Sequence, residues 1–315
     1  MAIPILSPGN YLKTTQDNLK LAVAAILAAT FALSLGDALI KRESVSFVLW
    51  QIFVMRSLIV MPFLIYFVRI HSCDTSLMPV RPGWTLLRSL LLVTMWVFYF
   101  TALPRVELAI AAAAYYTLPL FITLFAAWFL GDRITPRAWL AVLTGFAGTL
   151  LILQPQADDF NAYTLLPIVS AICYAGAMIL TRSKCQGEKP AILSLWLNIG
   201  FVAAGALALL LLQLWQPRPD LIARNAFLLG EWTPMRLDEW RVMGILAVMI
   251  LIGSIGAAIA YQKGPSAIIA TFDFAYVGLA AVWGFVFFSE IPGPLVLLGI
   301  AMIVGAGIVA VRQTS

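Results

Sequence analysis

Three charged residues stand inside apolar stretches of the sequence, where ionisable groups are costly and usually face a cavity or a partner. Asp37, Arg56 and Asp273 each lie within a different apolar run. The two acids could ligate a cation or carry a proton, and Arg56 could hold a carboxylate or phosphate with its planar fork. The alternative for Arg56 is an internal ion pair with one of the acids. The alternative for Asp37 is exposure at the membrane interface beside Lys41.

Aromatic and amide side chains form a second set of candidates within the apolar runs. They are Trp96, Tyr99, Tyr115, Tyr174, Tyr276 and Asn198. Aromatic rings can stack on a planar solute or bind a cation. For any single aromatic residue, packing or anchoring at the lipid interface is the alternative role. For Asn198, the alternative is a hydrogen bond between helices. Together with the three charges, these residues make up the predicted substrate site.

The elements that position these residues must lie in lipid. The sequence is 62% apolar and 11% charged, with a mean hydropathy of +0.95. Soluble proteins carry about 25% charged residues, so a soluble core cannot accommodate this composition. The net charge of +5 belongs to basic residues in the short gaps between apolar runs. No basic face with interleaved aromatics is present, which argues against nucleic-acid binding.

About ten apolar runs are long enough, or nearly long enough, to span a bilayer, and the fold class is therefore an all-α, polytopic membrane protein. The predicted spans are Leu19–Ile40, Phe47–Val68, Trp84–Leu103, Leu108–Leu130, Ala138–Leu153, Ala162–Leu180, Ile192–Leu214, Val242–Ala260, Ala267–Phe288 and Leu295–Val311. The long polar gap from Trp215 to Arg241 is expected to lie along the membrane surface. Lys and Arg are more frequent in the gaps on the side of the N-terminus, which predicts that both termini are cytoplasmic.

The two halves of the sequence resemble each other. A shift of 158 positions brings Asp132 onto Glu290, Pro136 onto Pro294 and Tyr115 onto Asp273. Each half, 1–155 and 156–315, has five spans, and an odd number gives the halves opposite orientations. Inverted repeats of this kind place a binding site near the midplane of the membrane, between the halves. Chance similarity between two apolar sequences is the simpler alternative.

Several short motifs in the two halves also resemble a repeat found in other proteins. In the first half they are Ala102-Leu103, the alanine-rich segment 109–114, Leu118-Pro119-Leu120, Leu130-Gly131-Asp132-Arg133, Trp139-Leu140 and the stretch from Gly145 to Gly148. The second half matches more loosely, at Ala267–Ala270, Ser289-Glu290, Gly299, Gly305 and Gly307. These motifs resemble the EamA repeat of the drug/metabolite transporter superfamily. The resemblance covers about Leu19 to Val311.

The resemblance implies a ten-helix transporter of the cell membrane, here a bacterial inner membrane, with a central cavity and no single substrate. Three positions depart from the family pattern. Asp132 stands where the family usually has Glu, Ala141 replaces a usual Gly, and Asp273 adds a charge to the ninth span.

The function expected from residues and resemblance is secondary transport of a small polar or amphipathic organic metabolite by alternating access. Two acids and one arginine at depth favour a cationic or zwitterionic solute, with protons or a counter-substrate as the driving partner. A translocase for lipid headgroups or polyprenyl phosphates is the alternative. His71 lacks ligand partners and no nucleotide motif occurs, so no catalytic site, metal or cofactor is expected. Small residues four apart, such as Ala141-Gly145-Thr149, predict that the fifth and tenth spans pack together and would suit a homodimer surface.

Overall fold

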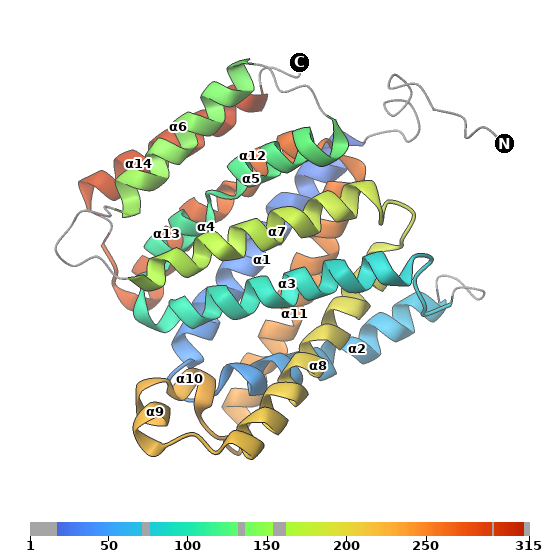
Figure 1. Cartoon of the computed structure of the whole chain (residues 1–315), viewed down its shortest axis with the longest axis vertical. Coiled ribbons are helices and arrows are strands. Elements are labelled where there is room, and N and C mark those ends of the chain that lie inside the picture. Colours follow the sequence, from blue (N-terminus) through green and yellow to red (C-terminus); the bar gives the residue numbers. More distant parts are fainter. Residues whose placement is uncertain (1–17, 71–75, 132–135, 154–161, 292, 312–315) are drawn as a thin grey trace.

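The computed structural model describes residues 18–70, 76–131, 136–153, 162–291 and 293–311, and within these ranges it contains helices and no strand. The long helices are α1 (Leu19–Glu43), α2 (Leu49–Ile70), α3 (Pro82–Ala102), α6 (Pro136–Leu153), α7 (Leu166–Ser183), α8 (Pro190–Trp215), α11 (Leu237–Lys263) and α14 (Pro294–Val311). They form one bundle in which most helices run roughly from one end to the other (Figure 1).

Two of the predicted spans are broken helices. The fourth consists of α4 (Leu108–Tyr115), α5 (Leu118–Phe125) and the π-helical turn Ala126–Leu130, and the ninth consists of α12 (Ser266–Asp273) and α13 (Ala275–Phe288). The fourth span is interrupted just before Pro119, which lies in the first turn of α5, since proline suits the first turn of a helix and not its interior. Both breaks lie where the 158-position shift aligns the halves.

All ten predicted spans have a helical counterpart in the described part of the chain. Seven of its helices are long and apolar enough to cross a membrane, and the apolar helices Leu118–Leu130 and Pro294–Ala306 are shorter. The fold class predicted from the sequence is therefore confirmed. One boundary differs clearly, because α11 begins at Leu237 and not at Val242. The Glu239 side chain accepts a hydrogen bond from the Arg236 backbone N–H, and this cap extends the helix into the polar segment.

The packing of the helices follows the pattern expected for two inverted repeats. Helix α1 packs against α11, and α7, the counterpart of α1, packs against α3, the counterpart of α11. Helices α2 and α8 are counterparts that pack on each other. So are α6 and α14, which lie side by side at one edge of the bundle (Figure 1). The proposed junction between residues 155 and 156 lies outside the described residues and stays a prediction.

The polar segment between α8 and α11 folds onto one end of the bundle. It contains the short helices α9 (Pro219–Arg224) and α10 (Ala226–Leu229). Trp50 donates its indole N–H to the Leu228 carbonyl at 2.8 Å. The Gln51 side chain donates to the Thr233 carbonyl at 2.7 Å and accepts from the Thr233 N–H at 3.1 Å. These bonds hold the segment against the first turn of α2.

Candidate substrate pocket

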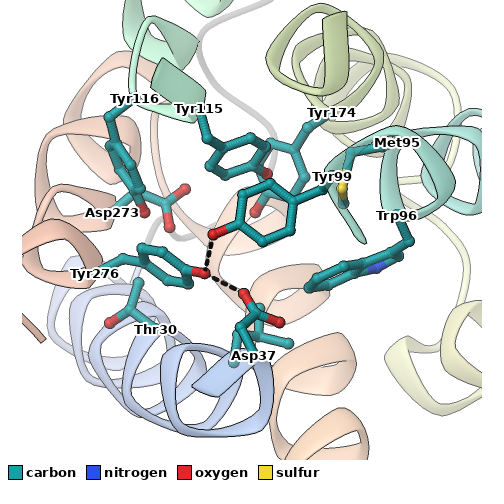
Figure 2. Close-up of a pocket in the computed structure, with 11 residues that line it drawn as sticks. Thr30, Asp37, Met95, Trp96, Tyr99, Tyr115, Tyr116, Tyr174, Asp273 and Tyr276 are labelled. Atoms are coloured by element: carbon teal, nitrogen blue, oxygen red, sulfur yellow. Dashed lines mark hydrogen bonds between the residues drawn. The ribbon is translucent and has the colours of Figure 1, made fainter. Parts of the chain in front are cut away.

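A small pocket lies where the two broken helices meet α1, α3 and α7 (Figure 2). Its wall consists of two acids, five tyrosines and a tryptophan, with smaller contributions from other side chains. The lining residues are Thr30, Leu33, Asp37, Met95, Trp96, Tyr99, Tyr115, Tyr116, Tyr174, Asp273 and Tyr276. Both halves of the chain therefore contribute to one site.

The carboxylate of Asp37 ends a hydrogen-bonded chain that connects the two halves. The Tyr276 hydroxyl on α13 donates to Oδ2 of Asp37 on α1. The Tyr276 hydroxyl oxygen is 3.0 Å from that of Tyr99 on α3. When Asp37 is ionised and accepts the Tyr276 proton, Tyr99 is the donor to Tyr276. Asp37 is 2% exposed, so its alternative position at the membrane interface is wrong.

Asp273 has a separate tyrosine partner on the opposite side of the pocket. The Tyr261 hydroxyl on α11 donates to Oδ2 of Asp273 at 2.9 Å. Asp273 is the last residue of α12, and Tyr115, its counterpart under the 158-position shift, is the last residue of α4. Both line the pocket. The chain thus places an acid at one helix break and a tyrosine at the other.

The tyrosine rings fill most of the space between the two acids. Tyr116 stacks on Tyr276 with ring centroids 5.4 Å apart, and Tyr115 meets Tyr99 edge to face at 5.4 Å. The remaining cavity measures about 20 Å³, which accommodates little more than one water molecule. The described conformation is therefore closed around the site. A metabolite fits only when the lining helices separate.

Comparison with known proteins agrees with this architecture. Residues 18–154 match the EamA-like transporter family. This match covers less than half of the 315 residues and shows that the first part of the chain is similar to that family. The family and the named relatives are membrane transporters of small molecules and not enzymes.

Relatives of this chain are similar over most of its length. The pseudopaline exporter of Pseudomonas aeruginosa is 27% identical over 297 residues, covering 94% of this chain and 98% of the relative. The riboflavin transporter of Brucella anthropi is 26% identical over 71% of this chain and 73% of the relative. The S-adenosylmethionine uptake transporter of Rickettsia bellii is 25% identical, covering 81% and 79%. A crystal structure with 20% identity superposes with a TM-score of 0.68 over 95% of this chain and 99% of the other, which shows the shared fold.

Seven of the nine site residues predicted from the sequence line the pocket. They are Asp37, Trp96, Tyr99, Tyr115, Tyr174, Asp273 and Tyr276. Asn198 and Arg56 do not. The Asn198 side chain donates to the Ser194 carbonyl of its own helix at 2.9 Å. Within the described residues, Arg56 forms no ion pair with either acid, so a direct pair is absent from this conformation.

Four lining residues were not predicted. Thr30 and Leu33 lie on the same face of α1 as Asp37, and helical spacing from that acid could have identified them. Tyr116 adjoins Tyr115 in the same aromatic pair of the fourth span, a signal that marks it as a candidate although it was not included in the predicted site, whereas Met95 has no comparable signal. Tyr116 faces the pocket because α4 ends at Tyr115, and a continuous helix would turn it elsewhere. Asp132 and His71 lie outside the described residues.

An ion pair closes the bundle near the α9–α10 end of the pocket. Lys41, one turn beyond Asp37 on α1, lies 2.6 Å from Oε1 of Glu290 and donates to the Val106 carbonyl at 2.9 Å. The other carboxylate oxygen of Glu290 accepts from the Leu108 N–H at 3.0 Å. Lys41 and Glu290 are each about one-seventh exposed. This contact joins α1 to the start of α4 and to the segment before α14.

Proposed function

We propose that this chain is a secondary transporter that moves a small polar or amphipathic metabolite across the bacterial cell membrane by alternating access. The observation that carries the proposal is the closed pocket at the two helix breaks, because its wall is shared by both inverted halves. Broken helices at the interface of inverted repeats form the substrate sites of several transporter folds. Rocking of one half against the other opens such a site to alternate sides.

Asp37 and Asp273 are the proposed ion-coupling groups. Both carboxylates are at least 95% buried, and no arginine or lysine lines the pocket with them. Buried acids without a basic partner bind a cation or exchange a proton. Transport therefore depends on a proton gradient or on a cationic counter-substrate.

A translocase for lipid headgroups is less well supported. Such a protein needs a cleft that opens sideways to lipid, and it needs basic groups for the phosphate. The pocket is enclosed by tyrosine rings and contains acids. Arg88 is a buried arginine on α3 that a phosphate ligand would need, but it donates to the Thr181 hydroxyl at 2.7 Å inside the bundle. The proposals of cytoplasmic termini and of a homodimer through α6 and α14 are independent of this choice.

Uptake by proteoliposomes tests the proposal. The panel contains riboflavin, S-adenosylmethionine and pseudopaline, the solutes named for the relatives, together with common amino acids, each measured with and without a proton gradient. We expect saturable transport of at least one solute. Transport of none would overturn the metabolite-transporter proposal.

Neutralising both acids tests the coupling role separately. The double substitution of Asp37→Asn and Asp273→Asn should abolish gradient-driven accumulation. Asp238→Asn, which changes an acid that is 80% exposed in a surface pair, is the matched control and should transport normally. Undiminished accumulation by the double variant would show that the acids do not couple transport.

A further inference from the structure

Arg56 is a buried cation held by aromatic rings and not by an acid. It lies on α2 with 3% exposure. Its guanidinium carbon is 4.7 Å from the ring centroid of Phe201, 5.0 Å from that of Phe53 and 5.9 Å from that of Phe100. Rings at these distances stabilise the positive charge through their faces.

The rings leave part of the hydrogen-bonding capacity of Arg56 unused. A guanidinium carries five N–H donors in its plane. Nε and Nη2 of Arg56 are buried and have no hydrogen-bond partner among the described residues. Arg88, an equally buried arginine on α3, differs in this respect, because it donates to the Thr181 hydroxyl and to the Leu193 carbonyl. Buried donors of a charged group are rarely left unmatched unless a ligand or another conformation uses them.

Other unmatched polar atoms occur on the helices that surround Arg56. Helix α2 packs against α8, and α8 packs against α3. The Ser57 hydroxyl on α2, the Ser89 hydroxyl on α3 and Oδ1 of Asn198 on α8 are also buried without a hydrogen-bond partner. In this closed conformation, several polar groups on these three helices are therefore buried without a hydrogen-bond partner among the described residues.

One aromatic layer connects Arg56 with the pocket. Trp96 lines the pocket beside Asp37 (Figure 2) and stacks on Phe100 with ring centroids 4.8 Å apart. Phe100 in turn contacts Arg56. The carboxylate of Asp37 also lies close enough to attract the guanidinium electrostatically. Movement of the Trp96–Phe100 pair would expose the Arg56 donors to the pocket.

We infer that the transported solute is a zwitterion whose carboxylate binds Arg56 in an opened conformation while its ammonium group stays beside Asp37. The inference rests on the proposed transport function and specifies its substrate class. A planar guanidinium fork matches a carboxylate with two parallel hydrogen bonds. The acids of the pocket select a positive group at the other end of the same molecule. An Arg56–Asp37 ion pair formed during opening is the rival account, and it needs no carboxylate on the solute.

Matched pairs of probes distinguish these accounts. Each pair is an amino-acid solute and its decarboxylated amine: S-adenosylmethionine with decarboxylated S-adenosylmethionine, and phenylalanine with phenethylamine. Binding is measured as thermal stabilisation of the purified full chain in detergent, and transport as proteoliposome uptake. We expect at least one zwitterion to bind at least tenfold more tightly than its amine. Arg56→Lys, which keeps the charge but loses the fork, should reduce that difference.

The outcomes separate the inference from the function it rests on. Binding of the amines as tight as that of the zwitterions would overturn the inference, and so would transport of riboflavin without transport of any zwitterion. Either result would leave the transporter proposal standing. Failure to transport any solute of the wider panel would overturn both. A carboxylate preference that Arg56→Lys does not change would also overturn the role of Arg56.

A comparison without ligand tests whether Arg56 is merely structural. Arg56→Met and Arg88→Met remove two buried arginines, one with unmatched donors and one with matched donors. Because Arg88 is hydrogen-bonded inside the bundle, its variant should lose more thermal stability. If Arg56→Met lowered the unfolding temperature as much as Arg88→Met, Arg56 would be a structural residue and the inference would fail.

Discussion

The hydroxyl group of Tyr276 links the two halves of the molecule at the pocket. It donates to Asp37 on α1 and accepts from Tyr99 on α3, whereas Tyr276 itself belongs to the second half. A hydrogen bond to a charged group contributes about 1.5–3 kcal/mol, more than a neutral one. The position of the Asp37 carboxylate therefore depends on a residue 239 positions away in the sequence.

Removal of this hydroxyl should impair transport without unfolding the protein. Tyr276→Phe keeps the ring that stacks on Tyr116 but leaves Asp37 without its donor. A loss of about 1.5–3 kcal/mol corresponds to a decrease of roughly tenfold to a hundredfold in transport rate. Initial rates in proteoliposomes measure it. Tyr66→Phe changes a tyrosine that is 68% exposed and is the matched control. Equal rates in the two variants would contradict the role assigned to Tyr276.

At the scale of elements, close packing between α1 and α11 determines how the halves fit together. A Cβ atom at Gly256 of α11 would lie 2.7 Å from the Ala25 carbonyl oxygen and 3.0 Å from the Ala29 Cβ. These atoms belong to α1, so Gly256 permits a close approach of two helix backbones. Small residues serve this purpose in membrane bundles, where dispersion contacts drive helix association.

Gly256→Val should therefore destabilise the bundle. Overpacking costs about 1–3 kcal/mol, and here the obstacle is backbone that cannot rotate away. The unfolding temperature in detergent should fall. Gly244→Val is the matched control on the same helix, since nothing lies within 4 Å of its added Cβ. An equal fall in both variants would indicate loss of helix flexibility or propensity and not loss of the α1–α11 contact.

The Lys41–Glu290 pair belongs to the same scale, because it ties three elements together near the pocket. Outside it lies a hollow of about 950 Å³ lined by Lys41, Arg42, Arg105 and residues of α9 and α10. Because Lys41 lines this hollow and lies one turn beyond Asp37 of the pocket, we expect that the pocket opens toward the hollow only when this pair separates. The pair is mostly buried and shares its carboxylate with the Leu108 N–H, so it should stabilise the closed state.

Glu290→Gln should favour opening at this end. The amide keeps a hydrogen-bond acceptor but loses the charge attraction to Lys41. A cysteine introduced by Thr30→Cys, in a background without Cys73, Cys173 and Cys185, reports access of a membrane-impermeant thiol reagent to the pocket. We expect roughly tenfold faster labelling, equivalent to about 1.4 kcal/mol.

Asp238→Asn provides the control for this measurement. Asp238 pairs with Arg241 at 2.9 Å, but both side chains are more than two-thirds exposed. Exposed pairs contribute little to stability. Labelling at position 30 should stay unchanged in this variant. Unchanged labelling in Glu290→Gln as well would show that the pair is not a gate.

At the scale of the whole molecule, the predicted orientation places the α9–α10 end outside the cell. Glu231 lies at that end and Gly187 lies between α7 and α8, and both residues are exposed. Each is replaced by cysteine in a separate variant, Glu231→Cys and Gly187→Cys. An impermeant thiol reagent added to intact cells should label the cysteine at 231 and not the one at 187. The reverse pattern would invert the orientation. The native Cys185 is fully buried, and burial raises the pKa of its thiol, so it should not react.

The sequence by itself determined the class of fold and most of the membership of the pocket. Its composition requires lipid as solvent, and its apolar runs have the length of membrane spans, so the helices follow from local chemistry. The aligned halves placed Tyr115 and Asp273 at equivalent points. Seven of nine predicted site residues line one pocket because ionisable groups inside spans are costly in lipid and face the interior, where the hydroxyl groups of tyrosines can bond to them.

Only the tertiary structure decided which of these polar groups meet. Asp37 contacts Tyr276, whereas Arg56 lies behind Trp96 in a cage of phenylalanines. Spacing along one helix identifies a face of that helix but not the helix that packs against it. The partners come from α1, α3 and α13, and their meeting depends on two helix breaks and on the close approach of backbones at Gly256. These are properties of the packed bundle, since each arises from atoms far apart in the chain.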